Sequence, residues 1–236
     1  MLKEIEQLLP LQEVDREIYS LRSKLNEFPP QISALTRQIE LIQEEIKKRL
    51  KSVEQKKLQH KELELELNKK ESDLKKYQAQ LFQVKTNKEY SALQEEIAKL
   101  KEEISSLEDN ILNLLDEIEV EEAEAKSFSL ESEKKIGDIK GKIDSLEQEK
   151  NEVKAKIEEL SEKRKELAKA VDPKLLEHYE RILEHRGGIA ISPVGKDGIC
   201  GGCYRSLPPQ VLNELMLGSK LIHCETCGCI LYYREE

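Results

Sequence analysis

VKTNKEY, at residues 84–90, separates two long series of regularly spaced apolar residues. Thr86 and Glu89 have the S/T-x-x-E spacing of a capping box, whose side chains satisfy free N–H groups at the start of a helix. Asn87, between them, tolerates turn geometry. The sequence therefore predicts that one helix ends and another begins here, with the turn at about residues 86–87.

The first arm, residues 2–85, carries apolar residues at alternating steps of three and four. Of the 16 such positions from residue 32 to residue 84, 12 are apolar. This period places an apolar stripe along one side of a helix, which buries the stripe against a partner helix. The four exceptions are Arg49, Lys56, His60 and Lys70.

The second arm, residues 88–171, shows the same period without a break from Leu93 to Ile118. The pattern blurs across residues 119–135 and then resumes with a shifted phase, as at a stutter in a coiled coil. Since the two arms have nearly the same length, we expect an antiparallel helical hairpin.

The charges of the two arms support this pairing. In such a hairpin, facing residues have numbers that sum to about 173, twice the turn position. The basic stretch KKRLKSVEQKK (47–57) then lies beside the acidic stretch DEIEVEEAEAK (116–126). Pro29 and Pro30, where a kink is expected, fall close to the only glycines of the second arm. We therefore favour an intramolecular hairpin over a parallel dimer.

The composition excludes several classes of protein. Charged residues make up 37% of the 236 residues and aromatic residues only 4%, which argues against a large enzyme with a deep pocket. The net charge of −9 has the wrong sign for a protein that grips nucleic acid mainly through phosphates. No run approaches the ~18 apolar residues of a membrane span, and the charged N-terminal stretch does not resemble a signal peptide. We expect a cytoplasmic protein.

All five cysteines lie in the last part of the chain. Cys200 and Cys203 form one C-x-x-C pair, and Cys224 and Cys227 form a second at the spacing of a four-cysteine zinc site. Four sulfur ligands close the coordination sphere, so such a zinc is structural. A redox dithiol, a disulfide pair or iron in the same cage remain alternatives. Cys229 is expected to be a spare thiol, although it is a candidate to alternate with Cys227.

The sequence after residue 171 indicates a second domain. Asp172 and Pro173 suit the start of a helix over 173–186, whose His178 and His185 have no evident partner. His223 is expected to be a strand residue. Short strands are expected at 189–194, 219–223 and 229–233, with a helix near 208–217. The predicted fold is mainly α: a long kinked antiparallel coiled-coil hairpin (1–171, tip near 85–90) followed by a small α+β zinc ribbon with a flanking helix (172–236).

This layout resembles the bacterial C4-type zinc ribbon coiled-coil family. The resemblance rests on the KTNKEY tip and on CGGCYRSLPPQVLNEL and LIHCETCGCILYY in the C-terminal part. It implies zinc ligands at Cys200, Cys203, Cys224 and Cys227. Position 229 departs from the family pattern, because members commonly carry Arg where this chain has Cys229. The resemblance also implies a cytoplasmic adaptor or chaperone that binds sigma-54 and flagellar or type III secretion components.

We therefore expect a non-enzymatic adaptor that binds proteins, with no membrane and no small-molecule substrate. The exposed tip is the candidate partner-binding site, with the residues Lys85, Thr86, Asn87, Lys88, Glu89 and Tyr90. The alternative is a zinc ribbon that binds RNA in transcription or post-transcriptional regulation, for which the nearest basic residues are Lys174, Arg181, Arg186, Lys196 and Arg205.

Overall fold

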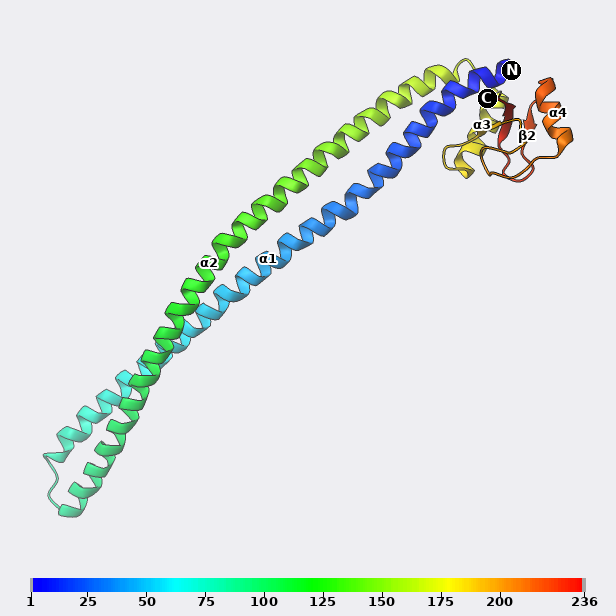
Figure 1. The fold of residues 1–236 in the computed structure, drawn as a ribbon. Helices are drawn as coiled ribbons and strands as arrows, with labels where there is room; N and C mark the ends of the chain where they lie inside the picture. Colours follow the sequence, from blue (N-terminus) through cyan, green and yellow to red (C-terminus); the bar gives the residue numbers. More distant parts are fainter. Residues whose placement is uncertain (1, 235–236) are drawn as a thin grey trace. The chain divides into compact units, whose positions relative to one another are not determined.

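A computed structural model describes residues 2–234 of the chain. It confirms a mainly α fold, with a long helical hairpin followed by a small C-terminal zinc ribbon (Figure 1). The elements in chain order are α1 (Lys3–Leu81), α2 (Asn87–Ala168), α3 (Pro173–His185), β1 (Ile191–Val194), α4 (Pro209–Leu217), β2 (Ile222–His223) and β3 (Ile230–Tyr233). Among the described residues, no helix combines the length and the apolar character that crossing a membrane requires.

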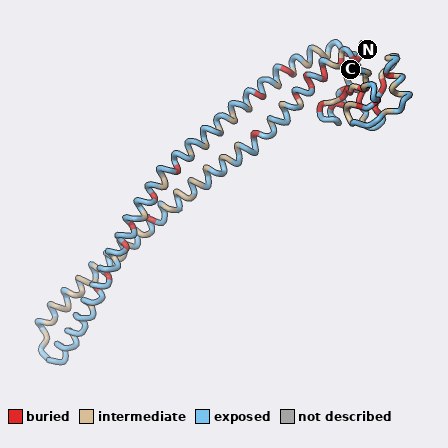
Figure 2. The backbone as a smooth tube through the Cα atoms, viewed as in Figure 1, coloured by how far each residue is buried: buried red, intermediate tan, exposed pale blue. Residues whose placement is uncertain are grey.

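The chain divides into two compact units, and the division does not follow the sequence boundary at residues 171 and 172. The ribbon unit comprises Met1–Ser33 and Ile143–Glu236, and the arm unit comprises Ala34–Lys142. The first part of α1 and the last part of α2 thus belong to the same unit as the ribbon, whereas the tip of the hairpin belongs to the arm unit. Figure 2 shows buried residues gathered at the ribbon and single buried positions spaced along the helices.

Within the arm unit, α1 and α2 pair in the predicted antiparallel register. The Lys56 ammonium lies 2.6 Å from a Glu117 carboxylate oxygen and 2.9 Å from one of Glu121. Nearer the tip, Lys70 lies 2.8 Å from Glu103. The expected opposition of the basic and acidic stretches is therefore confirmed within one chain.

Three of the four polar exceptions in the apolar series contact the other helix. Lys56 and Lys70 each form an ion pair with the other helix, and the Arg49 guanidinium lies 4.2 Å from the centre of the Phe128 ring. His60 keeps its Nε2 buried, without a hydrogen-bond partner among the described residues. Polar residues at core positions of a coiled coil select one register at some cost in stability.

The tip differs from the prediction at the end of the first arm. Helix α1 stops at Leu81, four residues before the expected end, and Gln83 N–H bonds to the Gln80 carbonyl at 2.8 Å. One bond of the capping box is present: the Thr86 hydroxyl accepts from the Glu89 N–H at 3.4 Å, while the Glu89 carboxylate accepts from the Thr86 hydroxyl at 2.7 Å instead of from its backbone N–H. Helix α1 also continues through Pro10, Pro29 and Pro30, so the expected kink at the proline pair does not interrupt it.

The ribbon unit contains a three-stranded sheet in the order β1-β3-β2. Strand β1 runs parallel to β3, with Ile191 opposite Ile230, and β2 runs antiparallel to β3. The strands are shorter than expected, but they lie inside the expected ranges.

Helix α3 begins where the sequence indicated. The Asp172 side chain accepts hydrogen bonds from the N–H groups of Lys174 and Leu175, as an N-cap does. The helix buries Tyr179 in a core that also contains Leu8 of α1 and strand residues of the ribbon. Residues far apart in the sequence therefore build one core beneath the cysteine-bearing loops.

Candidate metal centre

The first pair of cysteines lies on a tight loop, residues 200–205. Its ends are joined by two backbone hydrogen bonds, from Tyr204 N–H to the Cys200 carbonyl at 2.8 Å and from Cys200 N–H to the Arg205 carbonyl at 3.0 Å. This folding turns the Cys200 and Cys203 side chains toward the same side. We call this loop the first knuckle.

The second knuckle, residues 224–229, repeats the same hydrogen bonds. Gly228 N–H bonds to the Cys224 carbonyl at 2.8 Å, and Cys224 N–H bonds to the Cys229 carbonyl at 2.9 Å. The two loops are thus structurally equivalent, residue by residue. In this correspondence Tyr204 occupies the position of Gly228.

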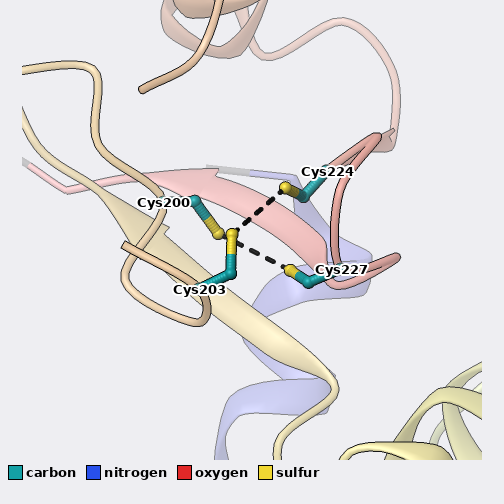
Figure 3. A group of neighbouring side chains, drawn as sticks. All are labelled: Cys200, Cys203, Cys224 and Cys227. Atoms are coloured by element: carbon teal, nitrogen blue, oxygen red, sulfur yellow. Dashed lines mark hydrogen bonds between the residues drawn. The ribbon is translucent and has the colours of Figure 1, made fainter. Parts of the chain in front are cut away.

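The four cysteines of the two knuckles bring their sulfur atoms together, with all four Sγ atoms within 4.8 Å of one another (Figure 3). Two distances cross between the knuckles, and both are 3.8 Å: Cys200 to Cys227, and Cys203 to Cys224. A tetrahedral zinc with Zn–S bonds of ~2.3 Å requires sulfur atoms about 3.8 Å apart. The predicted ligand set therefore has the geometry that zinc needs.

The ease of ionisation differs from one of these thiols to another. Burial opposes ionisation of Cys200, but the backbone N–H groups of Gly202 and Cys203 donate to its sulfur, and its pKa falls to about 7. In contrast, burial raises the pKa of Cys227, and the neighbouring thiols add to the rise. Zinc binds the thiolate form, so a bound dication favours the deprotonated state of all four cysteines.

Neighbouring residues fix the first knuckle in place. Arg186, just after α3, donates to the Gly202 carbonyl at 2.8 Å. A Cβ at position 202 would lie 2.9 Å from the Ser192 hydroxyl, so only glycine lets the knuckle approach β1 this closely. The Ser192 hydroxyl in turn lies 3.7 Å from the Cys200 sulfur.

Cys229 lies outside the cluster of four sulfur atoms. It is fully buried, and its thiol lies 3.7 Å from the Ile189 carbonyl. Its thiol also contacts that of Cys227, so its role as a spare thiol stays a prediction.

The histidines nearest the site contact each other rather than the sulfur cluster. Nε2 of His178 lies 2.9 Å from Nε2 of His223, and an Arg181 N–H reaches Nδ1 of His178 at 2.7 Å. Because arginine only donates, Nδ1 of His178 must accept. Burial, together with the neighbouring His178, lowers the pKa of His223. Sequence reasoning missed this contact, because its partners are 45 residues apart.

A second group that sequence reasoning missed attaches the ribbon to the hairpin. Asp15 of α1 is buried, accepts a hydrogen bond from the Tyr179 hydroxyl at 2.8 Å, and forms an ion pair with Arg164 at 2.6 Å. Arg164 also reaches Glu180 at 2.9 Å. One buried carboxylate therefore links α1, α2 and α3.

The predicted tip residues lie in the loop between the long helices and in the first turn of α2. The residue that stands out there is one that the sequence analysis did not select: Phe82 is 89% exposed. Tyr90 is also exposed, at 44%, and its hydroxyl accepts from Gln94 at 3.2 Å. The signal available in the sequence was a large apolar residue near the expected turn that falls outside the apolar series, between its members Leu81 and Val84.

The basic residues considered for RNA binding are partly engaged inside the ribbon unit. Arg181 donates to His178, and Arg186 donates to the Gly202 carbonyl. Lys196 lines an open hollow beside the first knuckle.

Comparisons with known proteins agree with this architecture. A family described as the CT398-like coiled coil hairpin domain matches residues 11–187, and one described as the C4-type zinc ribbon domain matches residues 199–231. The cysteine cluster is therefore a C4-type zinc site, and its zinc is structural. No curated protein matches the chain.

Three solved structures share the fold. CT398 from Chlamydia trachomatis is 22% identical, with a TM-score of 0.87 and 98% of each chain covered. The HP0958 protein from Helicobacter pylori is 24% identical, with a TM-score of 0.54 and coverage of 99% of this chain and 98% of that one. A protein from Mycobacterium smegmatis is 20% identical, with a TM-score of 0.76 and 97% of each chain covered.

Proposed function

We propose that this chain, which belongs to the CT398-like coiled coil hairpin family and ends in a C4-type zinc ribbon, is a non-enzymatic adaptor or chaperone. It binds other proteins in the bacterial cytoplasm. The zinc holds the ribbon together, and the tip of the hairpin is the site that meets the partner.

The observation that carries this proposal is the exposed aromatic at the tip. Phe82 leaves 89% of its surface in water, although burying such a side chain is worth about 1.5–3 kcal/mol. The adjacent turn is held by the hydrogen bonds between Thr86 and Glu89. Lys85 and Lys88 lie three and six positions after Phe82 in the chain and add positive charge to the tip. An exposed aromatic side chain in a stretch with two lysines suits insertion into an apolar pocket of a partner with acidic residues at its edge.

The zinc site supports a binding role rather than a catalytic one. Four thiolates fill the tetrahedral positions of the metal, so no position is open for water or substrate. What the metal supplies is stability, because ligand binding and folding are coupled in small zinc modules.

The resemblance noted from the sequence supplies candidate partners: sigma-54 and components of flagellar or type III secretion. The long helices suit such proteins, because partner helices bind in grooves along a helical pair. RNA is the alternative partner, and its binding would weaken steeply as salt concentration rises.

Calorimetric titration with purified sigma-54 from the same bacterium tests the proposal. The variant Phe82→Ser should lower the affinity at least tenfold, as expected for an aromatic anchor. The matched control is Leu65→Ser, which removes another exposed apolar side chain (63% exposed) from the same unit. Equal affinities of the two variants for sigma-54 would refute the tip as the binding site. Binding of the chain to RNA and not to proteins would refute the adaptor function and favour the RNA-binding alternative.

A further inference from the structure

The first zinc knuckle contains a residue in a backbone conformation that its side chain disfavours. Tyr204 has φ 56°, and it is the only described residue other than glycine with a positive φ. The equivalent position of the second knuckle is Gly228, at φ 74°. Glycine adopts this region readily, whereas other L-residues meet a steric penalty there. The first knuckle therefore holds a tyrosine in a strained backbone conformation, whereas the second knuckle has glycine, which adopts this conformation without strain, at the equivalent position.

Packing inside the protein does not account for this tyrosine. Its side chain is 82% exposed. Within residues 2–234, its ring makes no aromatic or cation–π contact and its hydroxyl makes no hydrogen bond. Backbone strain that internal contacts do not offset is typical of binding sites.

The surroundings of Tyr204 indicate what it binds. The ring borders a half-open hollow of about 440 Å³, whose apolar walls are Pro193 and Ile199. Lys196 and Arg234 also line this hollow, and neither forms an ion pair with another described residue. The one carboxylate at the hollow, on Asp197, accepts a hydrogen bond from Ile199 N–H at 3.1 Å.

We propose that Tyr204, Lys196 and Arg234 form a second binding site, which takes an acidic peptide segment of a partner protein with an apolar side chain among its carboxylates. The apolar side chain packs on the Tyr204 ring and against Ile199. The carboxylates pair with the Lys196 ammonium and the Arg234 guanidinium, and Arg makes bidentate pairs with such groups. This site lies in the ribbon unit and uses none of the tip residues.

An acidic peptide fits these observations better than a single strand of nucleic acid. An aromatic ring beside cations suits stacked bases as well. However, the hollow offers only two cations, and the chain as a whole carries a net charge of −9. Phosphate-dominated binding uses several cations and a favourable overall charge.

Fluorescence anisotropy with the full-length, zinc-loaded chain tests this site. The probe is a labelled peptide of sequence EEEFEEE, with KKKFKKK and an oligouridylate as comparison probes. We expect EEEFEEE to bind and KKKFKKK not to bind. Tyr204→Gly should weaken EEEFEEE binding at least tenfold, Lys196→Glu combined with Arg234→Glu should abolish it, and Tyr204→Phe should retain it.

Stability separates a binding role of Tyr204 from a structural one. Because glycine relieves the strain at a positive φ, Tyr204→Gly should keep its zinc and unfold at or above the temperature of the parent. A lower unfolding temperature would show that the tyrosine serves the fold, and would overturn the proposal. So would equal affinity of Tyr204→Gly and parent for EEEFEEE, or Tyr204-dependent binding of the oligouridylate alone. Phe82→Ser should leave EEEFEEE binding unchanged, so this site and the tip are tested separately.

Discussion

Gln12 of α1 pairs with both backbone polar groups of Ile191 in β1. Its side-chain oxygen accepts the Ile191 N–H at 2.5 Å, and its side-chain nitrogen donates to the Ile191 carbonyl at 2.8 Å. The same oxygen accepts the N–H of Ala190 at 2.7 Å. Strand β1 lies at the edge of the sheet. A helix side chain thus takes the place of a neighbouring strand along part of that edge.

Replacing Gln12 by Leu should therefore destabilise the ribbon unit. The substitution leaves three backbone groups without their partner in a buried place, where a lost hydrogen bond costs about 1–3 kcal/mol. We expect the free energy of unfolding to fall by about 3 kcal/mol in urea titrations. Gln31→Leu, at an exposed position of α1, is the control. Equal stability of the two variants would contradict this role of Gln12.

The link between Tyr179 and Asp15 should give the protein a distinct alkaline limit. Burial raises the pKa of Tyr179 far above its usual value, and the charge and hydrogen bond of Asp15 add to the rise. The contribution of Tyr179 to the free energy of unfolding is fully present below the pKa of an unfolded tyrosine, about 10. Above it, the unfolded phenol ionises while the folded one does not, so the stabilisation decreases by up to about 1.4 kcal/mol per pH unit.

Tyr179→Phe tests this dependence. Near neutral pH the variant should lose about 1 kcal/mol of stability, the value of a typical hydrogen bond. Between about pH 9 and 11, its unfolding free energy should fall less steeply than that of the parent. Parallel pH profiles for the two proteins would show that the phenol is not protected in the folded state.

The ion pairs between α1 and α2 should depend on the opposite charges of their two residues. Lys70→Glu places two carboxylates together at the Lys70–Glu103 contact, so it should lower the thermal midpoint. Adding Glu103→Lys restores opposite charges and should restore the midpoint. Failure of the double variant to recover would mean that the pair does not help to set the register.

Zinc should be held by four cysteines and not by the fifth. Cys203→Ser or Cys224→Ser should release the metal and unfold residues near 190–236, since coupled zinc binding and folding is worth about 10–16 kcal/mol in small modules. Cys229→Ala should keep one zinc per chain in a metal assay. The helical circular dichroism of the long helices should persist in every variant, and its complete loss would contradict the independent pairing of the arms.

The hairpin could be predicted because its determinants are local or periodic. The apolar period gave the helices, and the Thr86–Glu89 spacing gave the start of α2. The charge pattern then gave the register, which Lys56 and Glu117 satisfy. The end of α1 was placed too late, since no proline or glycine marks it.

The metal site was equally readable, because two C-x-x-C pairs at this spacing have few other uses. The pairing of sulfur atoms across the two knuckles could not be predicted, because it depends on how the loops fold. Gln12 and Asp15 escaped notice for a related reason. A polar residue in an amphipathic helix is ordinarily solvated, and the partners of these two are more than 140 residues away.

The core shared by Leu8, Leu11, Ile191 and Ile230 has a consequence for how the chain is made. Leu8 and Leu11 are translated about 180 residues before the strands that cover them. At about 5–20 residues per second, the first turns of α1 wait on the order of ten seconds or longer with their apolar side uncovered. Nascent chains therefore keep this apolar side of α1 uncovered until the ribbon strands have been translated.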